Sequence, residues 1–523
     1  MLDGYINGKS DYRSEMTLFE DRDSVISGAS WQYISSILLV VVGGLFYIFI
    51  IHSYSSQIVG VFSLISAIGY LFSIVFSLGL QQGTQHFISY HLGKGEEDFV
   101  RAFIRKFLLV SALLSIIGSL SLWSLSPLFS FWFFHTYAYL DYLRLVDVEL
   151  FSMIFNSILL FILVGLQNFK LNGILNIVNI SVGYGLIIPF IIINASPIRI
   201  IYAWIIGYYL TTALSFYAVR KRAIKREKGE LLKVEILPVF SYSIPIFISG
   251  LFSYGATYVD RFIVSYLLNL SELGIYNFSL LIVNAFGILI GPFAIILLSR
   301  LSFFYGNNDF NNFRLYSLKA SEVLAALYVP LALIVAALSP SILLFLANRT
   351  YLPGYEPIMI ILISSSMTVS VNIFSVTLQA IKKTRLFILS SSLALLANFV
   401  ISIIMIPKYG IDGAAVGYAS SNIAFFIVIL YFSKKYETYA VNMAKMFKIY
   451  VSGVAVFFLM IIVQDRLGYS VLKLFIYVVT GIAVYLFLVR ITGVFSEEDM
   501  DLFLQMVPNN YLRLKKFFKS LFV

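Results

Sequence analysis

The sequence predicts an all-helical (all-α) integral membrane protein with about 14 transmembrane helices. Two observations support this fold class. Apolar residues make up 60% of the 523 residues and charged residues only 12%, whereas a soluble domain is about half apolar and about a quarter charged. Apolar runs also recur along the chain, near the roughly 20 residues that a membrane-spanning helix needs. A soluble enzyme, a disordered chain and a fibrous repeat are therefore excluded.

The predicted spans are continuous apolar runs, and not the alternating ten-residue strands of a β-barrel. The chain has no cysteine, which excludes disulfide scaffolds and thiol catalysis, and its four histidines lack the spacing of metal ligands. The spans cover residues 25–51, 57–80, 106–126, 149–166, 174–194, 200–219, 238–266, 275–298, 320–346, 357–381, 386–406, 413–433, 449–464 and 470–489.

Basic residues are distributed unevenly between the loops that connect these spans. If the loops are numbered alternately from an inside N-terminus, the inner set contains 30 Lys and Arg residues and the outer set contains 6. Because basic residues are retained on the cytoplasmic side, this predicts a multi-pass protein of the cell (plasma) membrane with a cytoplasmic N-terminus. The net charge of +10 then reflects topology and anionic lipid headgroups, and no nucleic acid is expected as a partner.

The two halves of the chain resemble each other, which predicts an internal duplication. Residues 166–170 (LQNFK) are echoed 212 residues later by residues 378–382 (LQAIK), and Gly60 is echoed 214 residues later by Gly274. Six helices per copy is an even number, so the two lobes are parallel and are expected to hold substrate between them near mid-membrane. The predicted organisation is a cytoplasmic tail (1–24), an N-lobe (25–219), a basic linker (220–237), a C-lobe (238–433), two extra helices (434–490) and a cytoplasmic amphipathic tail (491–523).

Two stretches of the second half are similar to the signature of a known family. The first stretch is Tyr258–Ser265 (YVDRFIVS) followed by Ser271–Tyr276 (SELGIY), and the second is Ile406–Ala415 (IPKYGIDGAA). The chain thereby resembles the Wzx-type polysaccharide biosynthesis exporters, which are oligosaccharide-lipid flippases related to MATE drug exporters and to the lipid II flippase. The resemblance implies two six-helix lobes around a cavity that opens alternately to either side of the membrane. It also implies a cargo carried on an isoprenoid phosphate or pyrophosphate.

Asp260 and Arg261 are charged residues within an apolar run. Charge inside a membrane costs a few kcal/mol, so it marks a functional hypothesis. A guanidinium binds oxyanions bidentately, which makes Arg261 a candidate ligand for a phosphate or a sugar acid. The alternative is that either residue forms an ion pair between helices that holds one gating state, and for Asp260 this alternative is favoured.

A polar stripe enters the predicted fifth span from its cytoplasmic end. Asn172, Asn176 and Asn179 follow the i, i+4, i+7 spacing of one helix face. Amides offer donors and acceptors to sugar hydroxyls, although hydrogen bonding between helices is the alternative explanation. The other substrate-binding candidates are Gln167, Lys170, Asn284, Gln379 and Lys382.

The predicted function is to flip a lipid-linked oligosaccharide from the inner to the outer leaflet, for assembly of a cell-surface polysaccharide or a glycoprotein glycan. The stretch from Gly4 to Ser10 is one residue too short for a phosphate-binding loop, so an ATPase is not expected and the protein is predicted not to be an enzyme. No cofactor is expected apart from an unidentified coupling ion. The expected partners are the lipid-linked oligosaccharide, membrane lipids and glycosyltransferases of the same pathway.

Three alternatives remain open from the sequence. A MATE-like antiporter of small cationic compounds would be favoured by a cavity with an acidic lining. A membrane-integral glycan polymerase or ligase usually needs a sizeable outer loop, and the longest predicted one, residues 127–147, is mostly aromatic. A non-transporting scaffold for a glycan assembly complex is the third alternative.

Overall fold

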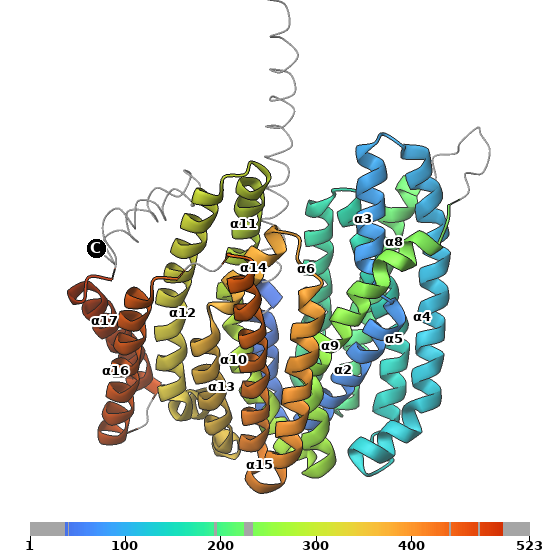
Figure 1. Ribbon diagram of the computed structural model, residues 1–523. Coiled ribbons are helices and arrows are strands. Elements are labelled where there is room, and N and C mark those ends of the chain that lie inside the picture. The colour runs from blue at the N-terminus through green and yellow to red at the C-terminus, as the bar shows by residue number, and fades with distance from the viewer. Residues whose placement is uncertain are drawn as a thin grey trace, which may run out of the picture. The chain divides into compact units, whose positions relative to one another are not determined.

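The computed structural model of this chain describes residues 37–39, 41–192, 196–223, 234–438, 441–468 and 471–494. Within these ranges the chain is almost entirely helical and contains no strand, which confirms the predicted fold class (Figure 1). The predicted N-terminal tail (1–24), the middle of the linker (224–233) and nearly all of the C-terminal tail lie outside the described residues.

The helices follow one another with short connections, and a helix over Ile37–Ser53 precedes the first labelled one. The labelled helices are α2 (Ser56–Ser77), α3 (Leu80–Gly93), α4 (Glu97–Phe134), α5 (Leu140–Gly165), α6 (Phe169–Gly185), α7 (Ile187–Ile192), α8 (Ile198–Ala223), α9 (Leu237–Leu267), α10 (Leu270–Ala285), α11 (Gly287–Gly306), α12 (Phe310–Leu346), the 3₁₀ turn η1 (Arg349–Gly354), α13 (Tyr355–Thr368), α14 (Val371–Ala380), α15 (Leu386–Lys435), α16 (Met443–Leu467) and α17 (Val471–Ile491).

The helices correspond well to the predicted spans. Ten helices in the described part of the chain are long and apolar enough to cross a membrane, and a bent pair, Arg349–Thr368 with Val371–Ala380, raises the number to 11. The 50-residue α15 contains two predicted spans, because Gly410 (φ 57°, ψ −134°) interrupts its helical geometry. Ile37–Ser53 and α10 are shorter apolar helices that also coincide with predicted spans. The prediction of about 14 spans is consistent with this set.

The first of two compact units comprises residues 1–49, 68–131 and 135–250. In it α5 packs along α8 and α3, and α6 packs along α8. The buried hydroxyls of Ser152 on α5 and Thr212 on α8 share a hydrogen bond of 2.5 Å. A Cβ atom at Gly207 would lie 2.8 Å from the Cα of Gly183, so glycine allows the backbones of α6 and α8 to approach closely.

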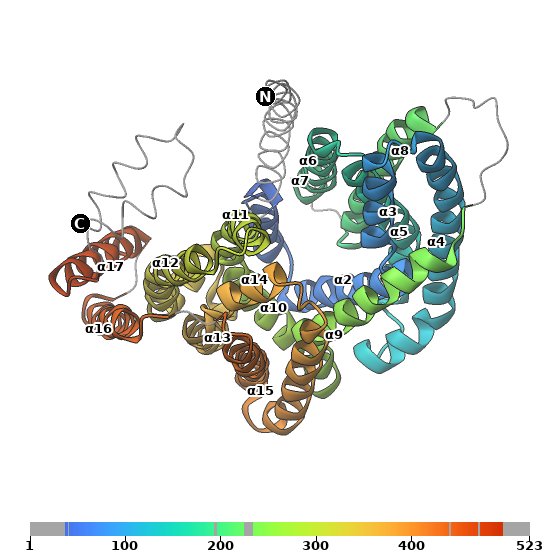
Figure 2. The same cartoon turned by 45° about the horizontal axis from the view of Figure 1, so that its top comes forward.

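The second unit comprises residues 50–67, 132–134 and 251–523. In this unit α12 packs against α13, α16 and α17, and Figure 2 shows α16 and α17 side by side next to α12. The side chain of Gln464 on α16 accepts a hydrogen bond from Ser341 Oγ at 2.7 Å and donates to the carbonyl of Ala337 at 3.3 Å. Tyr485 on α17 donates to the carbonyl of Ala326 at 3.0 Å. Buried hydrogen bonds therefore join the two extra C-terminal helices, α16 and α17, to α12.

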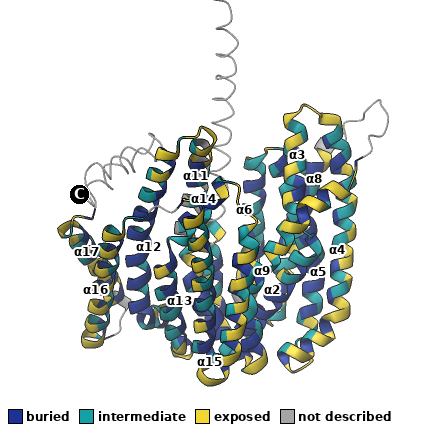
Figure 3. Ribbon diagram, in the orientation of Figure 1, coloured by how far each residue is buried: buried dark blue, intermediate teal, exposed yellow. Residues whose placement is uncertain are grey.

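Several helices expose long apolar faces, as the exposed residues along α4 and α16 in Figure 3 show. Only 22% of the most apolar 18-residue window of α4 is buried, and Leu109 on this helix is 69% exposed. Water would make such a surface unfavourable, because each exposed apolar side chain forgoes roughly 1.5–3 kcal/mol of burial free energy. These faces are therefore explained by a hydrocarbon solvent.

The turns after α5 and α14 share one hydrogen-bonded geometry. The turn after α5 has Gln167 at φ 58°, with Asn168 N bonded to the carbonyl of Leu163 at 2.9 Å, and the turn after α14 has Lys382 at φ 62°, with the same bond from Lys383 to Leu378 at 2.9 Å. Such left-handed turns commonly end helices, and the turn after α11 is another, with Asn308 at φ 57° and Asp309 N bonded to the carbonyl of Phe304 at 2.9 Å. The predicted alignment of Gln167 with Gln379 therefore stays a prediction.

Candidate functional site

Asp260 and Arg261 lie in the second half of α9, inside the second unit. Their exposed fractions are 0% and 6%, although both side chains are charged types. Asp260 accepts a hydrogen bond from the hydroxyl of Tyr276 on α10 and another from the backbone N of Arg261, at 2.9 Å for the latter. Each oxygen of this carboxylate therefore has a donor, as burial of a charge requires.

The guanidinium of Arg261 is held in a different way. Its Cζ lies 4.1 Å from the centre of the Tyr258 ring, in a cation–π contact. Tyr276 and Tyr418 are also within electrostatic reach of the guanidinium. Within the described part of the chain, Arg261 Nε has no hydrogen-bond acceptor. In this site the Asp260 carboxylate has hydrogen-bond donors on both oxygens, whereas the neighbouring Arg261 guanidinium has one N–H group, at Nε, without an acceptor among the described residues.

Hydrogen bonds from α15 fix the part of α9 that precedes this pair. Asn398 on α15 donates to the carbonyl of Ala256 at 2.9 Å and accepts from Ser402 at 2.8 Å. The hydroxyls of Ser253 and Ser391 lie 2.9 Å apart. Since Asn398 and Ser402 are fully buried, these bonds set the rotation of α9 and hence the direction of Arg261.

The predicted asparagine stripe is engaged in contacts within the first unit. Asn172 donates to the carbonyl of Leu160 on α5 at 2.9 Å and accepts from Asn176 at 3.1 Å. Asn179 accepts from Thr211 on α8 at 3.3 Å. These contacts match the alternative of hydrogen bonding between helices, and a role in sugar binding stays a prediction.

The remaining predicted residues lie at helix ends. Gln167 and Lys382 occupy the two left-handed turns described above. Asn284 lies in the last helical turn of α10. The five residues of this set are all exposed, and they are Gln167, Lys170, Asn284, Gln379 and Lys382. Their role in substrate binding stays a prediction.

Two buried acids of the first unit were missed by the sequence analysis. Asp147 is 3% exposed and Glu149 is 6% exposed. The structure describes no hydrogen-bond partner for either carboxylate oxygen of Asp147, whereas Tyr184 and Tyr208 lie within electrostatic reach of Glu149. The predicted span began at residue 149, but α5 begins at Leu140, so both acids lie about two turns inside a helix. The presence of two acidic residues within an apolar run was the feature of the sequence that could have identified them.

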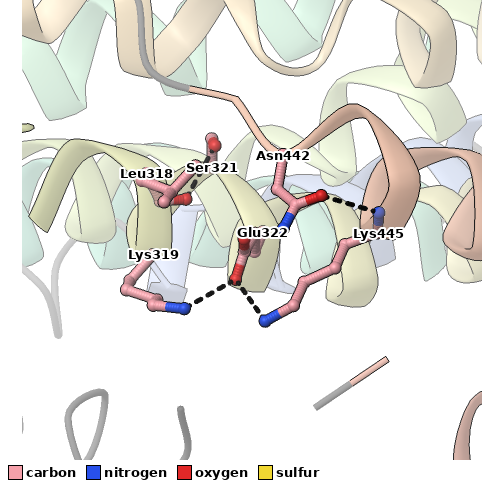
Figure 4. A network of polar contacts seen from close by, with 6 residues as sticks. All are labelled: Leu318, Lys319, Ser321, Glu322, Asn442 and Lys445. Atoms are coloured by element: carbon pink, nitrogen blue, oxygen red, sulfur yellow. Dashed lines mark hydrogen bonds and ion pairs between the residues drawn. The ribbon is translucent and has the colours of Figure 1, made fainter. Parts of the chain in front are cut away.

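Glu322 is another buried acid, and it takes part in a structural contact (Figure 4). It is 0% exposed on α12, and its Oε2 lies 3.4 Å from the Nζ atoms of both Lys319 and Lys445. Lys445 belongs to α16, whose first turn is capped by Asn442. This network joins α16 to α12. Within the described residues, no group of three or more His, Asp or Glu side chains is placed to hold a metal ion.

We expect Glu322→Ala to destabilise the second unit strongly. The substitution removes the buried carboxylate that joins Lys319 on α12 to Lys445 on α16, and loss of one partner of a buried ion pair typically costs about 3–5 kcal/mol. Glu437→Ala is the matched control, because its ion pair with Arg314 at 3.3 Å is between exposed side chains and such pairs contribute about 0–1 kcal/mol. Thermal melting of both variants in detergent checks this. Equal melting temperatures would show that the Glu322 network does not hold α16.

Comparison with known proteins adds a family and a fold. The profile of a family described as polysaccharide biosynthesis protein matches residues 55–354. No curated protein matches this chain in sequence. Among solved structures, the lipid II flippase MurJ in an inward closed conformation is similar, with a TM-score of 0.69 and 20% identity over 90% of this chain and 99% of that chain.

Two transporters of the MOP superfamily have a related fold. An inward-facing multidrug resistance MATE family transporter has a TM-score of 0.65 and 14% identity over 76% of this chain and 94% of that chain. A MOP superfamily transporter from Pyrococcus furiosus has a TM-score of 0.59 and 13% identity over 79% and 95%. These likenesses establish the fold. Since the family profile covers more than half of the sequence, the chain belongs to the polysaccharide biosynthesis protein family.

Proposed function

We propose that this protein flips a lipid-linked oligosaccharide, carried on an isoprenoid phosphate or pyrophosphate, from the inner to the outer leaflet by alternating access. The observation that carries the proposal is the family match over residues 55–354. A fold like that of a lipid II flippase and a buried arginine with an unused donor in a membrane helix support it.

The physical task explains why such a protein is needed. Moving one unpaired hydroxyl or amide into an apolar medium costs roughly 2–7 kcal/mol, and an oligosaccharide carries many hydroxyls. A transporter replaces the lost water contacts with polar side chains while the isoprenoid tail stays in the bilayer. No covalent bond changes in this process, so the proposal assigns the protein no enzymatic step.

Reconstitution tests the function directly. The purified protein is placed in liposomes that contain a fluorescent lipid-linked oligosaccharide, and a membrane-impermeant quencher reports how much of it is exposed. We expect quenching beyond the outer-leaflet fraction only in liposomes that contain the protein. Quenching equal to that of protein-free liposomes, with intact protein recovered from the membrane, would exclude flipping of this substrate.

The energy source and the partners belong to the same proposal. No nucleotide site is recognised in the sequence, so net transport requires an ion or voltage gradient, or consumption of the product on the outer side. Glycosyltransferases that supply the cargo at the inner surface are the natural partners. Imposing Na⁺, H⁺ or voltage gradients across the same liposomes distinguishes these energy sources.

We propose that the N-terminus faces the cytoplasm, on the basis of the basic loops. We therefore expect Lys94→Cys, in the α3–α4 turn, to be protected from an impermeant maleimide in intact cells. Tyr137→Cys, in the α4–α5 turn, should be labelled because Tyr137 is 61% exposed. The absence of native cysteine makes the background zero. The reverse labelling pattern would contradict the orientation.

One observation favours a second candidate function, export of small cations. Asp147 and Glu149 place two buried acids in the first unit, and acids suit a cationic cargo or a coupling ion. If this function holds, the liposomes should take up a cationic dye against a proton or sodium gradient, and Glu149→Gln should abolish uptake. If only the oligosaccharide moves, Glu149→Gln should leave dye leakage unchanged, and the second candidate is excluded.

A further inference from the structure

A pocket of about 820 Å³ lies in the second unit, among α13, α14, α15 and α16. Its volume is within the roughly 300–1,000 Å³ of small-molecule sites. On α15 the lining residues Phe426, Leu430 and Lys434 follow the i, i+4, i+8 spacing of one helix face. The lining also includes Met367, Met443, Ala444, Met446, Phe447 and Tyr450.

The pocket is suited to a hydrocarbon chain. Its few polar groups include Tyr450, whose hydroxyl donates to the carbonyl of Ser366 at 2.7 Å, so this group is already satisfied. Three methionines provide flexible, polarisable walls that adapt to an irregular chain. Met443 and Phe447 at the rim are 69% and 71% exposed, so the pocket opens through an apolar edge. A sugar would lose its hydrogen bonds there.

Positive charge marks one end of the pocket. Lys434 lines it in the last turn of α15, where Lys435 follows. Lys383 lies nearby, with its Nζ 4.8 Å from the ring centre of Tyr436, just after α15. Basic residues beside a crevice between transmembrane helices attract anionic lipid headgroups. The pocket therefore combines an apolar interior with a cationic mouth.

The depth of the pocket confines it to one leaflet. Its lining residues on α16 run from Met443 to Tyr450 at the start of that helix, which corresponds to about 11 Å along the axis. The lining residues on α15 are among its last ten. This depth is less than half of the roughly 30 Å hydrocarbon core. An occupant would stay in the leaflet at the basic ends of these helices, whereas a translocated cargo has to leave it.

We propose that this pocket binds an anionic phospholipid of that leaflet, with one acyl chain in the pocket and its phosphate at Lys434. The lipid fills the space between α16 and the helices α13 to α15. This site is separate from the proposed cargo site at Arg261, and it does not depend on which substrate the protein moves.

Native mass spectrometry of the delipidated protein tests the proposal, with phosphatidylglycerol and phosphatidylethanolamine added in equal amounts. We expect one phosphatidylglycerol to be retained in preference to phosphatidylethanolamine. Lys434→Gln should lower its retention about five-fold, as expected for one basic residue near a lipid surface. Lys435→Gln is the matched control and should not change it, because Lys435 does not line the pocket. Ala444→Trp should abolish retention by filling the pocket, and exposed Ala444 tolerates a larger side chain.

Three results would overturn the proposal. Equal retention of the two phospholipids by the unmodified protein would remove the charge preference. Unchanged retention in Lys434→Gln and Ala444→Trp, with melting temperatures equal to that of the parent, would place the lipid elsewhere. Displacement of phosphatidylglycerol by an equal amount of an isoprenyl phosphate would assign the pocket to the cargo. None of these measurements uses flipping, so they are independent of the proposed function.

Discussion

Arg261→Ala is expected to abolish flipping in the liposome assay while the protein still inserts into the membrane. The substitution removes the donor that lacks an acceptor in the described structure and leaves the fully buried Asp260 without its cationic neighbour. Loss of a buried charge partner typically costs about 3–5 kcal/mol, so the melting temperature should fall as well. Arg314→Ala is the control, because Arg314 is an exposed arginine in a weak ion pair.

A double variant separates the two roles of Arg261. In Asp260→Asn with Arg261→Gln, both charges disappear together, so stability should return toward that of the parent. If Arg261 binds the anionic part of the cargo, flipping stays lost in this stable double variant. If Arg261 only neutralises Asp260 within one gating state, flipping returns with stability. The measurement is the flipping rate of the double variant compared with each single variant.

A disulfide between residues 56 and 271 is expected to stop flipping reversibly. Ser56 on α2 and Ser271 on α10 already share a hydrogen bond, with their Oγ atoms 2.5 Å apart. The helices cross backbone to backbone here, because a Cβ at Gly60 would lie 1.8 Å from the carbonyl oxygen of Leu270 and a Cβ at Gly274 would lie 2.0 Å from that of Ser56. Oxidation of Ser56→Cys with Ser271→Cys would fix α2 to α10. Alternating access requires equivalent helices of the two repeats to change their contacts, so the rate should fall to background and recover on reduction.

A second cysteine pair provides the control for this cross-link. Ser253 and Ser391 join α9 to α15 with an Oγ separation of 2.9 Å. Both helices belong to the second repeat and are already joined by Asn398, so Ser253→Cys with Ser391→Cys should form a disulfide and leave flipping intact. The native chain has no cysteine, so each pair is the only one that can form. Full activity of the oxidised 56–271 pair would show that the α2–α10 crossing does not move.

The sequence was sufficient for the fold class because hydropathy acts residue by residue. An apolar run of about 20 residues is stable across a bilayer whatever its neighbours are, so the helices could be placed without knowledge of their contacts. Gly410 also matched a predicted break, since the runs on either side of it were separately apolar. The register of the repeats stays a prediction, because turns like those at Gln167 and Lys382 also end other helices, as at Asn308.

The site was predicted only in part. Asp260 and Arg261 were found because a charge in an apolar run is visible in the sequence. What they touch was not predictable, since Tyr276 lies 16 residues after Asp260 on the next helix and Tyr418 lies much further along the chain. Glu149 was missed because the boundary of its helix was misplaced. The spacing of the asparagines did not reveal that Asn172 contacts α5 and that Asn179 contacts α8.

By itself, the sequence determined which segments enter the membrane and that Asp260 and Arg261 enter with them. Only the tertiary structure decided that Gly60 and Gly274 contact each other's helices, that Glu322 joins α16 to α12, and that a pocket opens between α15 and α16. The reason is physical. Entry into lipid depends on the free energy of transfer of each residue, whereas a contact depends on the rotation and distance of two helices, which the packing of all their neighbours sets together.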